Sequence, residues 1–322
     1  MTEKFNFYDI YGFALPGFLL LAVLWLPFGL IEAKWPDAEL SSALLGIIIA
    51  YIIGHVLQQV ARQAMPSNFL GGRFPSTAIL DEHNATFTGE FKRRLAKQIK
   101  DVFEIDVSYG SSDQVRNDAF FLCRSALIKS KTVAYAEQFE GLHALMRGLT
   151  AAFAIAVVYY LGWAYSGLLQ PIKTFRFVPR AFGSFSSSGL VILAGIIIAI
   201  ASFLIADRFK DFKDEKSRRI VKTSKSALRL SLLIAAFAAG YYLGLSSARL
   251  SEHRSQLIAA AVLSFFAAER CYAGYKVFGE EFAKAVYRDF SNYEKPAEEQ
   301  RANPNPASVK IGSSHTSKAD GE

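Results

Sequence analysis

The chain has 322 residues, of which 52% are apolar and only 20% are charged, and it contains two cysteines. This composition is too apolar for an intrinsically disordered protein and too poor in cysteine for a disulfide-stabilised scaffold. Charges are absent from runs of about 20 residues and crowd between them, which is typical of a chain that crosses a bilayer and not of a soluble globule. The sequence therefore predicts an all-α, polytopic membrane protein.

Six runs are candidates for transmembrane helices, because roughly 20 apolar residues at 1.5 Å per residue cross about 30 Å of hydrocarbon. The first is interpreted as a retained helix and not a cleaved signal peptide, since Pro16 interrupts its long apolar core and no A-x-A site follows. The last is short and carries the charged pair Glu269–Arg270, so a full crossing there stays open. In chain order the runs are 10–31, 40–61, 148–172, 189–206, 230–248 and 255–275.

The six runs divide the chain into transmembrane hairpins, cytoplasmic helices and a tail. The expected parts are a first hairpin (1–61), a small cytoplasmic helical domain (62–147), a second hairpin with a basic helix (148–229), a third hairpin with an amphipathic helix (230–293) and a disordered polar tail (294–322).

Lysine and arginine are distributed unequally between the two sides of this topology. The side that holds both termini carries most of the 36 basic residues, so we expect both termini in the cytoplasm and the chain in the inner membrane. The net charge of +7 then indicates attraction to the anionic inner leaflet, and no basic motif interleaved with aromatic residues favours a nucleic-acid partner. The basic residues on the other side are Lys34, Lys173, Arg176, Arg180, Arg249 and Arg254.

A basic amphipathic helix is predicted in the cytoplasmic domain. From about Thr86, apolar residues recur at helical spacing, and between them stand five cations that are candidates for contact with the lipid surface. Such a helix lies on the inner leaflet or packs its apolar stripe within its own domain, and the sequence leaves both open. A second helix is expected after a capping box at 111–114. The five cations are Lys92, Arg93, Arg94, Lys97 and Lys100.

Polar residues gather at the inner end of the second run. His55, Gln58, Gln59 and Arg62 stand at i, i+3, i+4 and i+7, and with Glu269 they are candidates for the lining of a polar vestibule. The alternative interpretations of the four are hydrogen bonds across helices, or a helix that leaves the membrane there. The alternative for Glu269 is a charge that reaches the headgroups.

Two segments of the sequence resemble each other. Residues 151–162 read AAFAIAVVYYLG and residues 235–244 read AAFAAGYYLG, which suggests a parallel repeat of helical hairpins. Within the second copy, Gly240 and Gly244 form a small-xxx-small pattern that permits close helix packing in a bundle or an oligomer.

No group of residues with recognisable catalytic chemistry appears. The five histidines include no i, i+4 pair, the two cysteines lack zinc spacing, and neither a phosphate-binding loop nor a G-x-S-x-G nucleophile is present. Arg116-Asn117 lacks the following histidine of RNA-cleaving helical domains. We therefore expect no catalytic residue, no metal site and no cofactor.

The amino-terminal residues Tyr8 to Gly17 have the form Y-D-x-x-G-x-x-x-P-G. In this motif and in its hairpin layout, the chain resembles a set of poorly characterised bacterial multi-pass inner-membrane proteins. Some of those proteins are linked to anti-phage defence as membrane effectors. The resemblance implies an effector that acts at the bilayer, and it supplies no catalytic residues.

The leading hypothesis is a non-enzymatic integral membrane protein that forms homo-oligomers. It would act as a pore or a scaffold, with a cytoplasmic domain that senses or docks a protein partner. A small-solute transporter built from hairpin repeats is the alternative, and it requires polar groups near the middle of the membrane, where only Glu269 is a candidate. A membrane-anchored enzyme is the third possibility.

The topology gives a first test. Alkaline phosphatase fused after Arg62 is expected to stay inactive, because this position is predicted to face the cytoplasm. The full chain is expected to remain in membranes washed with alkaline carbonate. Phosphatase activity at this fusion point, or release of the chain by carbonate, would contradict the predicted topology.

Overall fold

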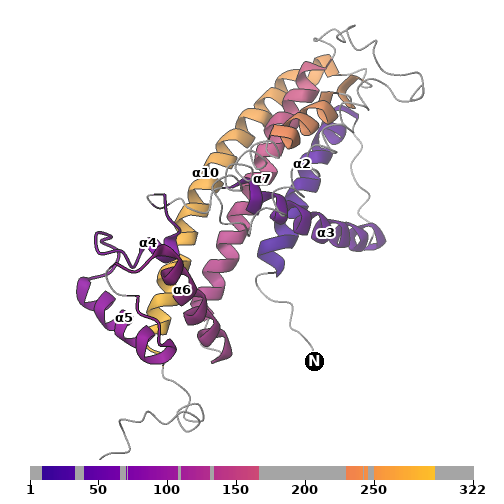
Figure 1. Cartoon of the computed structure of the whole chain (residues 1–322). Helices are drawn as coiled ribbons and strands as arrows, with labels where there is room; N and C mark the ends of the chain where they lie inside the picture. The colour runs from indigo at the N-terminus through magenta and orange to yellow at the C-terminus, as the bar shows by residue number, and fades with distance from the viewer. Residues whose placement is uncertain are drawn as a thin grey trace, which may run out of the picture. The chain divides into compact units, whose positions relative to one another are not determined.

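A computed structural model describes residues 9–32, 40–65, 70, 72–107, 110–130, 134–166, 230–241, 243–245 and 250–293. The elements in these residues are helices without a strand, so the predicted all-α class is confirmed. In chain order they are η1 (Ile10–Ala14, a π-helix), α2 (Leu15–Glu32), α3 (Leu40–Ala64), α4 (Pro75–Ala78), α5 (Gly89–Phe103), α6 (Asp113–Lys129), α7 (Ala134–Tyr165), a helix over Leu230–Leu245 and α10 (Leu250–Phe290), most of them labelled in Figure 1.

Four helices are long and apolar enough to cross a membrane: Ile10–Ile31, Ala43–Ala64, Tyr135–Tyr165 and Glu252–Phe290. They contain the first and sixth predicted runs and overlap most of the second and third. The fifth run corresponds to the shorter helix Leu230–Leu245, and the run 189–206 lies outside the described residues. The structure is thus that of a helical protein with four candidate membrane spans.

The chain forms two compact units. The first contains η1, α2, α3, α7 and α10 as far as Ala285, and the second contains Ile79–Val133 and the chain from Val286. The division differs from the predicted cytoplasmic domain 62–147, because α7 begins at Ala134 and continues without a break into its apolar segment. Helix α10 contributes residues to both units.

Helices α2 and α7 run in parallel through the first unit. Pro16 packs where a side chain on Gly148 would stand, and further along the pair the Tyr159 hydroxyl donates to the Leu24 carbonyl at 3.1 Å. The aromatic ring of Phe28 meets the buried Trp163 edge-on at 5.3 Å. Large rings thus fill the space between the two helices at the end distant from Pro16.

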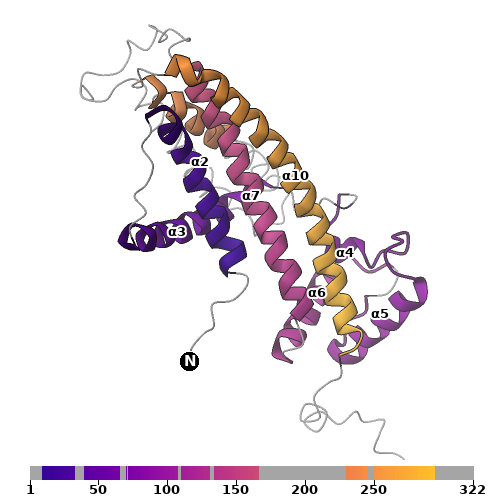
Figure 2. The same ribbon diagram turned by 180° about the vertical axis from the view of Figure 1, so that it is seen from behind.

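Helix α10 lies antiparallel to α7, and Figures 1 and 2 show the two side by side. Nδ1 of His143, early in α7, lies 2.9 Å from the carbonyl oxygen of Tyr275, late in α10, whereas Trp163 shares a hydrophobic cluster with Leu257. The helices have 32 and 41 residues, about 48 and 60 Å at 1.5 Å per residue, against a hydrocarbon layer of about 30 Å. Both helices are therefore longer than a membrane crossing requires.

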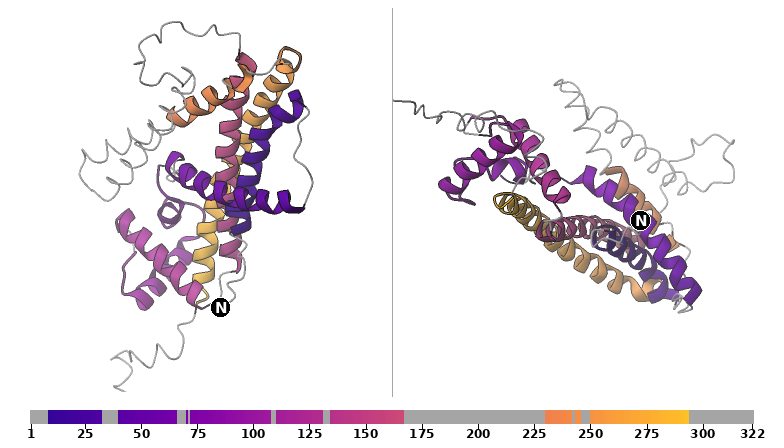
Figure 3. Two further views of the ribbon diagram at one scale, coloured as in Figure 1. Left: turned by 90° about the vertical axis from the view of Figure 1, so that its right-hand side faces the viewer. Right: turned by 90° about the horizontal axis from the view of Figure 1, so that it is seen from below.

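Helix α3 crosses α2 at two glycines. Side chains on Gly17 and Gly54 would clash with the backbones of Ala50 and Phe13, so the two helices approach to backbone contact. Figure 3 (left) shows α3 lying across the other helices of this unit and not alongside them. Its outward face is apolar and exposed, with Leu44, Leu45, Ile47, Ile48, Ile52 and Val56.

The second unit is built from two capped helices and the end of α10. Thr88 accepts a hydrogen bond from the Phe91 amide at the start of α5. Ser112 does the same for the Val115 amide at the start of α6, so the capping residue lies within the predicted box. The Gln98 side chain donates to the Phe290 carbonyl at 2.8 Å. The two caps fix the first turns of α5 and α6, and the Gln98 contact joins α5 to the end of α10.

The core of the second unit is formed by the apolar stripe of α5. Leu95 and Ile99 are fully buried, and Phe103 stacks on Phe290 at 5.5 Å. Tyr287 packs edge-on against Phe120 at 5.5 Å. Of the two alternatives for the amphipathic helix, the structure shows the stripe packed within its own unit, which leaves the cations on the outside.

The glycine crossing gives a matched pair of variants. Gly54→Ala is expected to lower the melting temperature in detergent by about 2–8 °C, because overpacking costs about 1–3 kcal/mol where the opposing atoms are backbone. Gly46→Ala, in the same helix, has open space around the new methyl group and is expected to leave the melting temperature unchanged or raised. Equal melting temperatures for the two variants would contradict the crossing.

Candidate functional site

Gln58 joins three helical segments of the first unit through its side-chain amide. Nε2 donates to the carbonyl oxygens of Gly12 at 2.5 Å and Ala144 at 2.6 Å, and Oε1 accepts from Nε of Arg147 at 3.0 Å. The residue is 1% exposed. The two N–H donors of the Gln58 amide each have a carbonyl acceptor, and its oxygen has an N–H donor. The side chain therefore holds η1, α3 and α7 together at one point.

The amino-terminal motif explains why the Gly12 carbonyl is available to accept a hydrogen bond from Gln58. In an α-helix the Gly12 carbonyl would accept from the amide four residues later, but that residue is Pro16, which has no N–H. The backbone instead forms the π-helix η1, in which the Leu15 amide bonds the Ile10 carbonyl. The Gln58 amide then supplies a donor to the Gly12 carbonyl, which lies in an apolar segment where an unpaired carbonyl is costly.

The other members of the predicted polar stripe do not share this environment. His55 is exposed and stacks on Phe13 at 3.7 Å. Gln59 and Arg62 are exposed on α3. Only Gln58 of the four is buried, because it lies on the face of α3 that meets η1 and α7. Arg147, which completes the network, has no counterpart among the residues singled out from the sequence, since it precedes the third predicted run.

Glu269 is exposed on the surface of α10 and is not buried between this helix and the others that the structure describes. Its carboxylate is 3.8 Å from Nε of Arg270, and the two side chains are 60% and 87% exposed. Exposed apolar residues precede the pair on the same helix: Ile258, Val262, Leu263, Phe265 and Phe266.

The two glycines of the small-xxx-small pattern pack against α7 within the chain. A side chain on Gly240 would clash with the Tyr159 carbonyl, and one on Gly244 would clash with the Ser166 hydroxyl. In return, Gly162 lies against the backbone of Phe237. The two segments that resemble each other in sequence therefore pack on each other through their own glycines.

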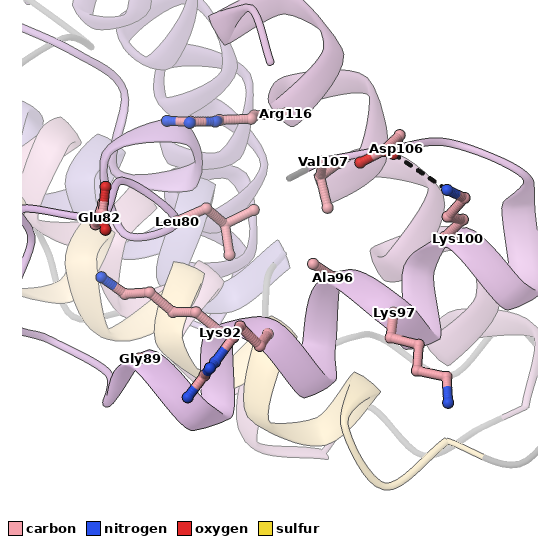
Figure 4. Close-up of a pocket in the computed structure, with 11 residues that line it drawn as sticks. Leu80, Glu82, Gly89, Lys92, Ala96, Lys97, Lys100, Asp106, Val107 and Arg116 are labelled. Carbon is pink, nitrogen blue, oxygen red and sulfur yellow. Dashed lines mark hydrogen bonds and ion pairs between the residues drawn. The ribbon is translucent and has the colours of Figure 1, made fainter. Parts of the chain in front are cut away.

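A cavity of about 720 Å³ opens in the second unit (Figure 4). One face of α5 lines it from Gly89 to Lys100, with the cations Lys92, Arg93, Lys97 and Lys100, and Arg116 of α6 is a fifth cation. Its other lining residues include Leu80, Glu82, Ala96, Asp106 and Val107. Four of the five cations predicted for the lipid surface thus border a cavity, and Arg94 does not.

Figure 4 shows how the charges are arranged around this cavity. Leu80, Ala96 and Val107 lie at its centre, with Lys92, Arg116 and Glu82 toward one end. At the other end Lys100 and Asp106 form an ion pair of 3.2 Å.

Most of the internal partners of these cations are weak or neutral. Nζ of Lys92 donates to the backbone carbonyls of Asp81 and Asn84, and burial lowers the pKa of Lys92 although the Asp81 and Glu82 carboxylates act to raise it. The Arg116 guanidinium is buried and lies 3.5 Å from an Asp81 carboxylate oxygen. No local pattern in the sequence predicts that Arg116 lines the same cavity as α5, because this placement depends on how α6 packs.

The Gln58 network gives a second matched pair. Gln58→Leu keeps the volume but leaves the Gly12 carbonyl and the Arg147 guanidinium without this partner, so we expect a loss of about 1–3 kcal/mol in the free energy of unfolding. Gln59→Leu, one residue along and exposed, is expected to change it by less than about 0.5 kcal/mol. Denaturant unfolding in detergent measures both. Equal losses would show that the network does not stabilise the helices.

The chain was compared with protein families, curated proteins and solved structures. No protein-family model matches the chain, and neither a curated protein nor a solved structure matches it.

Proposed function

We propose that the chain is a multi-pass inner-membrane protein that acts without catalysis, as an oligomeric effector. In this proposal the second unit is cytoplasmic and docks a partner or ligand, both termini are cytoplasmic, and the spans form a pore or a scaffold in response. The observation that carries the proposal is the continuity of α10, whose 41 residues run from a candidate membrane span into the core of the second unit.

A continuous helix is a means of coupling. Tyr287 and Phe290 are fully buried among the aromatic side chains of the second unit, and Leu257 and Ala261 of the same helix are buried in the first. A ligand that changes the packing around the end of α10 therefore acts on an element that also belongs to the span bundle. Such coupling requires that the ligand bind one arrangement more tightly than the other.

The surface of α10 supports self-association. An exposed charge pair next to exposed phenylalanines is costly against lipid, and a second copy offers both an apolar surface and the opposite charges. In a two-fold contact, Glu269 of each copy would face Arg270 of the other. A transporter is less well supported, because the acidic residue expected to line its path is exposed on the outer face of α10.

Reconstitution tests this proposal. The full chain in liposomes is expected to form oligomers and to release a trapped fluorophore if it is a pore. If it is a scaffold, it forms oligomers without leakage and captures a cytoplasmic partner through the second unit. Saturable uptake of one solute that is lost in Glu269→Gln would contradict the proposal and support a transporter.

The charge pair predicts the behaviour of two double variants. Glu269→Gln with Arg270→Gln is expected to weaken oligomers in detergent at least tenfold, because the cross-copy pairing is lost. Glu252→Gln with Lys276→Gln removes the same two charge types from exposed positions of the same helix and is expected to change the oligomer less than twofold. Sedimentation measures both. Equal effects, or a wild-type monomer, would rule out association through this face.

A further inference from the structure

The cavity of the second unit combines an excess of positive charge with an apolar centre. Five cations and two carboxylates line it, and the side chains between the charged ends are Leu80, Ala96 and Val107. Leu80 and Val107 are buried in the unit, so their positions are set by the core and not by solvent. The cavity is therefore a formed part of the fold.

The volume of the cavity depends on small residues on α5. Gly89 and Ala96 share the lining face with the cations, and a side chain at Gly89 would meet no atom within 4 Å. Longer side chains at these two positions would project into the space between α5 and the opposite wall. The helix therefore presents its cations around an opening of about 720 Å³, which is the size of a small-molecule site.

The cations are only partly neutralised by the described residues. Lys100 pairs with Asp106, but both side chains are more than half exposed, and such a pair is readily exchanged. Lys92 is held by backbone carbonyls, which carry no net charge. Arg93 and Lys97 stand at i and i+4 on the lining face without an ion pair in the described part of the chain, so they repel each other.

We propose that this cavity binds a phosphate-bearing ligand whose apolar portion packs on Leu80, Ala96 and Val107. Phosphate fits the site because its several acceptor oxygens match the ammonium and guanidinium donors that border the cavity, and arginine binds phosphate in a bidentate manner. Arg93 and Lys97 are exposed and contact the ligand by turning their long side chains toward it, since Figure 4 shows Lys97 directed away from Leu80 and Val107. Lys92 and Lys100 exchange an internal acceptor for a phosphate oxygen. This inference rests on the proposed docking role of the second unit and names the chemistry of what docks there.

Two sources supply this chemistry. One is a water-soluble phosphate ester or polyphosphate, and the other is the headgroup of an anionic phospholipid in the inner leaflet. They differ in one measurable respect, because a soluble ligand binds when every lipid present is uncharged, whereas a headgroup binds only when anionic lipid is supplied.

The test uses the full chain in nanodiscs of phosphatidylcholine, titrated with inorganic pyrophosphate in a calorimeter. We expect saturable binding, weakened at least tenfold in the double variant Arg93→Gln with Lys97→Gln. The matched control is Arg94→Gln with Lys129→Gln, which removes the same two charge types from α5 and α6 outside the cavity and should change the dissociation constant less than twofold. Sodium chloride at equal ionic strength controls for screening.

The second arm measures acylation of Lys97 by an amine-reactive reagent, relative to the exposed Lys129, in nanodiscs with and without phosphatidylglycerol. Pyrophosphate binding that the control variant retains supports a soluble ligand. Selective protection of Lys97 by phosphatidylglycerol, without pyrophosphate binding, supports a lipid headgroup.

Three results would overturn the inference. They are absence of both effects, equal loss in the two double variants, and protection that sodium chloride reproduces. Helix content by circular dichroism checks that each variant is folded. Neither arm depends on leakage or oligomerisation, so a failure of the proposed effector function and a failure of this ligand site can be told apart.

Discussion

The first unit depends on a hydrogen-bonding constraint set by proline. Pro16 removes the amide donor that would satisfy the Gly12 carbonyl in an α-helix, and an unpaired carbonyl is costly in an apolar segment. The buried amide of Gln58 meets this requirement and at the same time bonds Ala144 and Arg147. One side chain therefore fixes the start of the first candidate span against two other helices, which leaves the backbone little freedom to shift at this point.

Close backbone contact gives the rest of this unit its arrangement. Without a hydrophobic driving force between helices in lipid, packing relies on small residues that let backbones approach. Gly17 and Gly54 bring α2 and α3 together, and Gly162 and Gly240 do the same for α7 and the helix Leu230–Leu245. Aromatic rings fill the wider spaces, as Trp163 does between α2 and α7.

The second unit is stabilised differently, because its core consists of buried apolar side chains and not of close contacts between helix backbones. The stripe of α5 and the end of α10 are packed together, so the cations of α5 are left to surround a cavity. Burial raises the pKa of the Cys123 thiol, which makes this cysteine a core residue and not a reactive one.

The sequence by itself determined the helical class and the approximate position of the apolar helices, since charge-free runs of sufficient length have no other stable state in a bilayer. It also determined the cationic face of α5 and the start of α6, because periodicity and capping are local properties. The tertiary structure decided that α7 and α10 extend beyond the apolar runs, that Gln58 is buried while Gln59 is exposed, and that Arg116 faces α5. These outcomes depend on which faces of distant helices meet, and residues such as Arg147 and Arg116 acquire their partners only when segments far apart in the chain are packed together.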